Sequence, residues 1–248
     1  MTEQGGGDVT IQPQAAMLVV TGGVPAVRIR DYLASQHLWT ARRESELCRL
    51  REDRIGVSTE LDRCRLSHAT NTVLAAVAFL DAFIGSVWQD AADGERNHLT
   101  ANIPDSALAE MRRLWKGDKN AERRYGIVKK FQTALTLSGR DRIPEHADLL
   151  ESVKVLVEFR NALVHFKPRW REHGKDIDLD KILKSKITSD LAYPAHMQPW
   201  FPHKPLSAKS ARWACDTVIA FTRDWHSRMG MSGDFDSYYV ASDPFEIE

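Results

Sequence analysis

One apolar segment in the second half of the chain constrains the fold more than any other feature of the sequence. Its apolar residues recur at the three- and four-residue spacing of an amphipathic helix. They are Leu149, Val153, Leu156, Leu163 and Val164. We therefore predict a helix from Glu145 to Phe166, with Pro144 at its favoured start and one apolar face in a core. Pro168 should end this helix, because the residue before a proline avoids the α conformation.

Three polar side chains lie in the last two turns of this expected helix. Asn161 and His165 are four residues apart and share a face. Arg160 lies about 140° around the helix axis from His165, so the two side chains meet only through the length of the arginine or a loosened last turn. A histidine at this position can transfer protons near neutral pH. An arginine beside it can hold a phosphate group with its planar guanidinium.

The run Arg160-Asn161-Ala-Leu-Val-His165 resembles the Arg-Asn-x-x-x-His signature of HEPN domains, all-helical modules named for nucleotide binding in higher eukaryotes and prokaryotes. The resemblance covers residues 61–171. Many members of that family are metal-independent endoribonucleases of defence and toxin systems. The resemblance implies that two copies of the motif meet in a homodimer and form one RNA-cleaving site. It makes Arg160, Asn161 and His165 the catalytic residues, requires no metal or cofactor, and suggests a regulatory protein or antitoxin as a further partner.

Cleavage of this kind would use the 2′-hydroxyl of RNA as the nucleophile and leave a 2′,3′-cyclic phosphate. Two other interpretations of the motif stay open. One is a non-catalytic HEPN-like dimeric module that binds nucleotide, RNA or a protein partner. The other is a chance match, in which Arg160 pairs with a carboxylate and His165 is an ordinary helix-end histidine. The net charge of zero, from 34 basic and 34 acidic side chains, lacks the basic excess typical of nucleic-acid binders.

A short basic run follows the motif and is the candidate RNA-binding segment. Lys167, Arg169 and Arg171 surround Trp170, and cations next to an aromatic ring are typical of surfaces that hold a nucleic-acid backbone and stack on its bases. The alternative is that these cations only interact favourably with the C-terminal end of the helix dipole.

A second strong helix is predicted from Leu66 to Asp90. Its apolar stripe is wide, which predicts a central place in a bundle. The stripe consists of Val73, Val77, Leu80, Phe83, Ile84, Val87 and Trp88. Asp81 interrupts it. This carboxylate either supports the motif, by orienting His165 or pairing with Arg160, or lies exposed on a narrow polar face.

The other predicted elements complete an all-α bundle with a small N-terminal hairpin. The hairpin strands are Ala16–Val20 and Val24–Ile29, and further helices are expected at 31–53 (one or two helices), 106–115, 120–137, 178–185 and 207–229. Leu33, Leu47 and Leu50 are the expected core residues of the first of these helices, and Lys129 and Lys130 are expected to be exposed. We expect a disordered tail at 1–14, a hairpin and helix packing on the bundle at 15–60, the HEPN-like domain with its C-terminal helix at 61–230, and an acidic tail at 231–248.

Cysteine usage and hydropathy predict a soluble, cytoplasmic protein. The three cysteines form no C-x-x-C pair, which favours buried thiols in a reducing compartment. No signal peptide is visible, and the apolar run Val73–Trp88 is too short to span a bilayer. His196 and His203 have no third ligand at a recognisable spacing, so no metal site is expected.

Overall fold

The computed structural model describes residues 15–21, 24–56, 61–117, 124–168, 170, 177–187, 200–231, 234–241 and 244. The chain divides into two compact units, residues 1–33 and residues 34–248. In the first unit, β1 (Ala15–Thr21) pairs antiparallel with β2 (Val24–Arg30), and Thr21 lies opposite Val24. The predicted hairpin is therefore confirmed, whereas its packing on the helices stays a prediction. Residues 1–14, the expected disordered tail, lie outside the described part of the chain.

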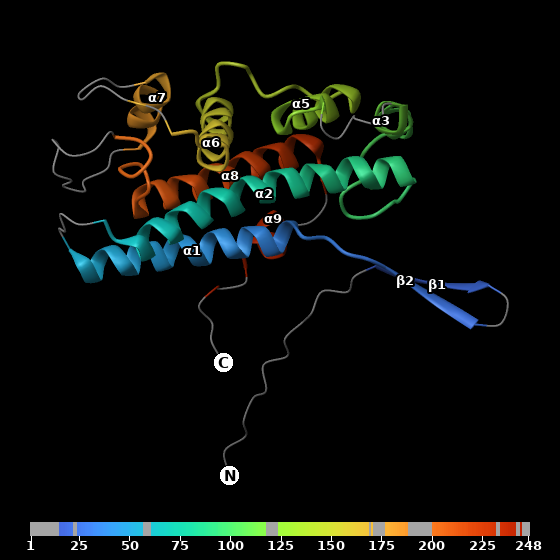
Figure 1. The fold of residues 1–248 in the computed structure, drawn as a ribbon. Coiled ribbons are helices and arrows are strands. Elements are labelled where there is room, and N and C mark those ends of the chain that lie inside the picture. Colours follow the sequence, from blue (N-terminus) through green and yellow to red (C-terminus); the bar gives the residue numbers. More distant parts are fainter. Residues whose placement is uncertain are drawn as a thin grey trace, which may run out of the picture. The chain divides into compact units, whose positions relative to one another are not determined.

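The described part of the second unit is helical, which confirms the all-α class. Its helices are α1 (Ala34–Ile55), α2 (Arg63–Asp93), α3 (Asp105–Gly117), α5 (Ile127–Leu137), α6 (Asp148–Val164), α7 (Asp178–Lys186), α8 (Ala208–Met229) and α9 (Phe235–Tyr239). The long helices α1, α2 and α8 lie side by side, and α3, α5 and α6 pack on α2, with α5 and α6 also in contact with α8 (Figure 1). The first predicted segment, 31–53, is thus a single helix.

Helix α2 forms the centre of this bundle, as its wide apolar stripe predicted. All seven residues of the predicted stripe are buried. The helix begins after Asp62, whose carboxylate accepts a hydrogen bond from the N–H of Arg65, and it ends at Gly94 in the left-handed conformation that favours glycine. Its length and composition would suffice to cross a membrane. The expectation that its apolar run is too short is therefore wrong, but 56% of the apolar window is buried inside the bundle, as in the core helix of a soluble protein.

An aromatic cluster joins the two C-terminal helices, α8 and α9, to this centre. The Phe83 ring lies 5.7 Å from the Trp225 ring of α8 and 5.5 Å from the Tyr239 ring of α9. The indole N–H of Trp225 donates to the carbonyl oxygen of Phe131 at 3.0 Å. Residues 235–239 of the expected acidic tail thus form a short helix, and Phe235 and Tyr239 are buried.

Three local predictions are wrong. Of the predicted core leucines, Leu33 is 58% exposed, Leu50 is 45% exposed and Leu47 is half-buried. Helix α1 packs instead through the small side chains Ala34, Ala41 and Cys48 together with Leu38. Helix α6 begins at Asp148 and not at Glu145, after a turn in which the N–H of Ala147 donates to the carbonyl of Pro144. Helix α5 begins at Ile127 and not at Asn120, and residues 120–123 of the segment predicted for it are outside the described residues.

Candidate functional site

The motif lies at the C-terminal end of α6, a helix whose body belongs to the core. Leu150, Val153, Leu156 and Phe159 are fully buried. The last helical residue is Val164, two residues before the predicted end, and the N–H of His165 donates to the carbonyl of Asn161 at 2.9 Å. The helix therefore stops just before the segment in which Pro168 forbids its continuation.

An aromatic side chain from outside α6 holds this end in place. The ring of Phe201, which is buried, lies 6.2 Å from the Phe159 ring and 6.1 Å from the Phe166 ring. Phe201 thus contacts α6 on one side of the motif and the chain that follows it on the other.

The three motif side chains differ in their exposure. Asn161 and His165 are exposed to solvent, whereas Arg160 is half-buried. The Nε atom of Arg160 is buried and has no hydrogen-bond partner among the described residues. A buried donor without an acceptor costs about 1–3 kcal/mol. Arg160 thus carries a buried donor that the described residues leave unsatisfied, whereas the imidazole of His165 is open to solvent.

Apolar side chains around the motif are exposed, which the sequence did not predict. Val164 is 53% exposed, Phe166 is 46% exposed and Trp170 is fully exposed. The spacing from Val153 places Val164 on the buried face, yet more than half of its side chain is exposed. Helical periodicity predicts which face of a helix is apolar, but it does not predict how far along the helix other elements pack on that face. Exposed apolar residues gathered at one place are typical of contact surfaces.

The predicted RNA-binding run is described only in part. Lys167 and Trp170 are exposed beyond the end of α6. Arg169 and Arg171 lie outside the described residues. A role of these four residues in RNA binding remains a prediction.

Asp81 has a partner that the sequence did not suggest. Its carboxylate accepts a hydrogen bond from the ammonium group of Lys130 on α5 at 3.0 Å. The side chain of Asp81 is 54% exposed and that of Lys130 only 4% exposed, so the prediction that Lys130 is exposed is wrong. The Lys130 ammonium also lies 5.5 Å from the centre of the Trp115 ring. The exposure of Asp81 agrees with the predicted position on a narrow polar face, where water and Lys130 together solvate the carboxylate. A supporting role at the motif stays a prediction.

Two of the three cysteines have the buried thiols that the sequence predicted. Burial raises the pKa of the Cys48 thiol and of the Cys215 thiol to about 12 in each case. Cys64 is exposed, contrary to the prediction.

His203 is half-buried, and its pKa is lowered by that burial and by the nearby Arg65 charge. Groups of three or more histidine, cysteine or carboxylate side chains that could hold a metal ion do not occur among the described residues, and His196 lies outside them.

Comparison of the chain with protein-family models, with curated proteins and with solved structures found no match.

Proposed function

We propose that this protein is a metal-independent endoribonuclease of HEPN type that acts as a homodimer, in a defence or toxin-like role. The observation that carries the proposal is the arrangement at the end of α6. There the half-buried Arg160 has a buried Nε with no hydrogen-bond partner among the described residues, and Asn161 and His165 are exposed in the same two turns of chain. The exposed apolar side chains of Val164 and Phe166 adjoin this end and provide a surface against which a second copy can pack.

In the proposed reaction, the 2′-oxygen of a ribose attacks the adjacent phosphorus and the bond to the 5′-oxygen of the next nucleotide breaks. The 2′-hydroxyl loses a proton and the departing 5′-oxygen gains one. His165 from one protomer takes the first proton, and His165 from its partner supplies the second. Arg160 from both protomers stabilises the extra negative charge on the phosphoryl oxygens. Asn161 binds a phosphoryl oxygen or orients the imidazole.

The test is cleavage of labelled single-stranded RNA in the presence of EDTA, with the all-deoxy oligonucleotide as the substrate control. We expect the wild-type protein to cut the RNA to products that carry a 2′,3′-cyclic phosphate and a 5′-hydroxyl, identified by mass spectrometry. His165→Ala should lower the rate at least a hundredfold, the contribution of a positioned acid–base group being about 10²–10⁴. His146→Ala is the matched control, because His146 is also exposed and lies just before α6. Equal rates for His165→Ala and wild type would refute the mechanism.

A second candidate function is a non-catalytic HEPN-like dimeric module that binds nucleotide, RNA or a protein partner. It is favoured by the net charge of zero, which provides no general attraction for RNA. In this case purified wild-type protein has no nuclease activity, while Arg160→Gln and His165→Ala weaken self-association in sedimentation experiments. Metal-independent cleavage that His165→Ala abolishes would exclude this module.

A further inference from the structure

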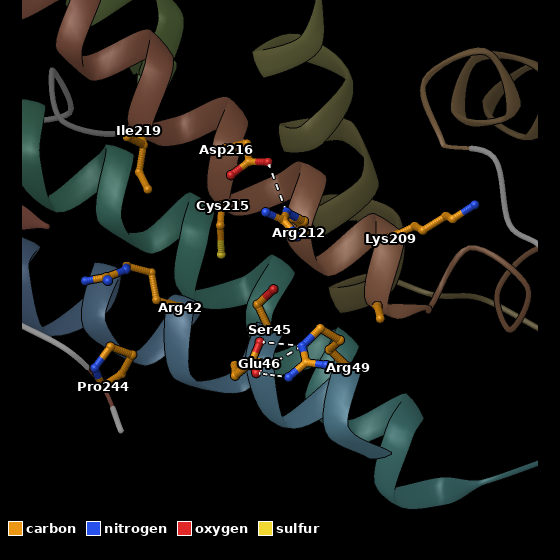
Figure 2. A pocket seen from close by; sticks show the side chains of 11 residues that line it. Arg42, Ser45, Glu46, Arg49, Lys209, Arg212, Cys215, Asp216, Ile219 and Pro244 are labelled. Carbon is orange, nitrogen blue, oxygen red and sulfur yellow. Dashed lines mark hydrogen bonds and ion pairs between the residues drawn. The ribbon is translucent and has the colours of Figure 1, made fainter. Parts of the chain in front are cut away.

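A groove between α1 and α8 has no part in the proposed nuclease. It encloses about 720 Å³, within the range of small-molecule sites (Figure 2). Its walls are one face of α1, one face of α8 and Pro244 from the C-terminal segment. The lining residues used below are Arg42, Ser45, Glu46, Arg49, Arg212 and Cys215. We propose that this groove binds a small phosphate-bearing molecule.

The middle of the groove is polar but carries no charge. Ser45 on α1 and Cys215 on α8 hydrogen-bond to one another through their side chains (Figure 2). Because burial raises the pKa of the Cys215 thiol to about 12, the thiol stays protonated at neutral pH. The hydrogen bond between them uses one of their two donor protons, and the other can be donated to an anionic oxygen without repelling it. A thiolate or a third carboxylate at this place would exclude a phosphate.

Cations outnumber carboxylates around the groove, although the whole chain has no net charge. The lining residues include three arginines and a lysine, against the carboxylates of Glu46 and Asp216. Lys209 extends away from the arginines of α1 in Figure 2, so the local excess comes mainly from the guanidinium groups. Planar guanidinium groups bind phosphate oxygens in pairs, which an ammonium group cannot do.

Each arginine has a different role in this site. Arg42 donates to the carbonyl of Val240 at 2.6 Å and so ties the C-terminal segment that carries Pro244 to α1. Arg49 is held by Glu46 and by Asp53. Arg212 is the cation best placed to move to a ligand, because its ion pair with Asp216 is 3.8 Å long and both side chains are more than 70% exposed. Exposed pairs of this kind contribute about 0–1 kcal/mol, so a phosphate can displace the carboxylate.

The shape of the site favours a small molecule over a nucleic acid. A single-stranded nucleic acid requires a long positive surface with aromatic rings for its bases. The described lining of this groove contains no aromatic residue, and its cations gather between two helix faces and Pro244. A ligand that contacts α1 and α8 together stabilises the folded state by mass action.

The experiment is calorimetric titration of the full chain with inorganic pyrophosphate, in a phosphate-free chloride buffer at constant ionic strength. Thermal unfolding at increasing pyrophosphate gives a second readout. We expect saturable binding and a rise in Tm, and about tenfold weaker binding by Arg212→Gln, as for the loss of one charge-assisted hydrogen bond. Arg113→Gln is the matched control: Arg113 is an exposed arginine in a helical ion pair with Glu110 on α3, outside the groove.

Three results would overturn the proposal. The first is the absence of saturable pyrophosphate binding up to millimolar concentration. The second is equal weakening by Arg113→Gln and Arg212→Gln, which indicates general attraction to cations. The third is binding of a single-stranded oligoribonucleotide that depends on Arg212 when pyrophosphate does not bind. None of the lining residues belongs to α6, so a failure here is distinguishable from a failure of the nuclease.

Discussion

The pair formed by Asp81 and Lys130 provides a test of whether Asp81 belongs to the fold or to the motif. Replacing Asp81 with asparagine keeps an oxygen acceptor and removes the negative charge opposite a lysine that is only 4% exposed. Removal of one partner costs about 3–5 kcal/mol for a fully buried ion pair and about 0–1 kcal/mol for an exposed one. The carboxylate here is half in water and the ammonium group is not. The Trp115 ring near the ammonium group offers partial compensation. We therefore expect a loss of about 2 kcal/mol of unfolding free energy.

The assay is urea unfolding at pH 7 with the m-value compared between variants. Asp178→Asn is the control, because Asp178 forms a similar pair with Lys181 at 3.2 Å but is 93% exposed, and its loss should cost less than about 0.5 kcal/mol. In the double variant Asp81→Asn/Lys130→Met, the loss of unfolding free energy should be smaller than the sum of the losses in the two single variants. The reason is that Lys130→Met also removes the buried ammonium group that Asp81→Asn leaves without its partner. Equal effects of the Asp81 and Asp178 variants would refute this reasoning. A change in the imidazole NMR signals of His165 in Asp81→Asn would instead assign Asp81 to the motif.

Three further predictions concern the groups that hold α2 in place and the exposed thiol. Arg51 and the Arg65 N–H lower the pKa of Asp62 from 3.8 to about 2, so its stabilising contribution is complete above pH 3.8 and is lost as the pH falls toward 2. Asp62→Ala should lower the free energy of unfolding by about 1–2 kcal/mol at pH 7. It should also weaken the fall of that free energy with pH below pH 3.8, and an unchanged fall would contradict this. Arg65→Met should cost about 2–4 kcal/mol in urea unfolding, because it leaves the Leu206 carbonyl without its donor at 2.8 Å; a loss below 1 kcal/mol would show that water replaces the guanidinium. A thiol reagent at pH 8 should modify one cysteine in the native protein and three after unfolding, and Cys64→Ser should abolish the native reaction.

The sequence predicted the long helices best, because their apolar residues leave little choice of buried face. Helix α2 has apolar residues over most of its circumference, and every predicted stripe residue is buried. Helix α1 has two candidate faces, one with leucines and one with small residues. The close approach of α2 decides between them in favour of Ala41 and Cys48, and such a distance is a property of the packed pair that neither helix encodes alone.

The candidate site shows the same division between local and long-range information. The place of Arg160 and His165 at the end of a helix follows from the apolar spacing and Pro168, all within one segment of chain. The pair of Asp81 and Lys130 joins residues 49 positions apart, and the groove joins α1 to α8. Periodicity within one segment carries no information about such partners, so both features could be found only from the fold.

The end of α6 is where the demands of folding and of the proposed chemistry conflict. Folding favours covering Val164 and Phe166 and pairing the Nε of Arg160, and in the single chain these apolar side chains stay exposed and that donor has no partner among the described residues. Most buried donors in native proteins are paired, and departures from such rules gather at functional sites. A second copy of the chain can cover the apolar side chains, and a bound phosphate can satisfy the guanidinium. Formation of the proposed dimer on its substrate would remove both departures, and for this reason we propose the active site there and not in the α1–α8 groove.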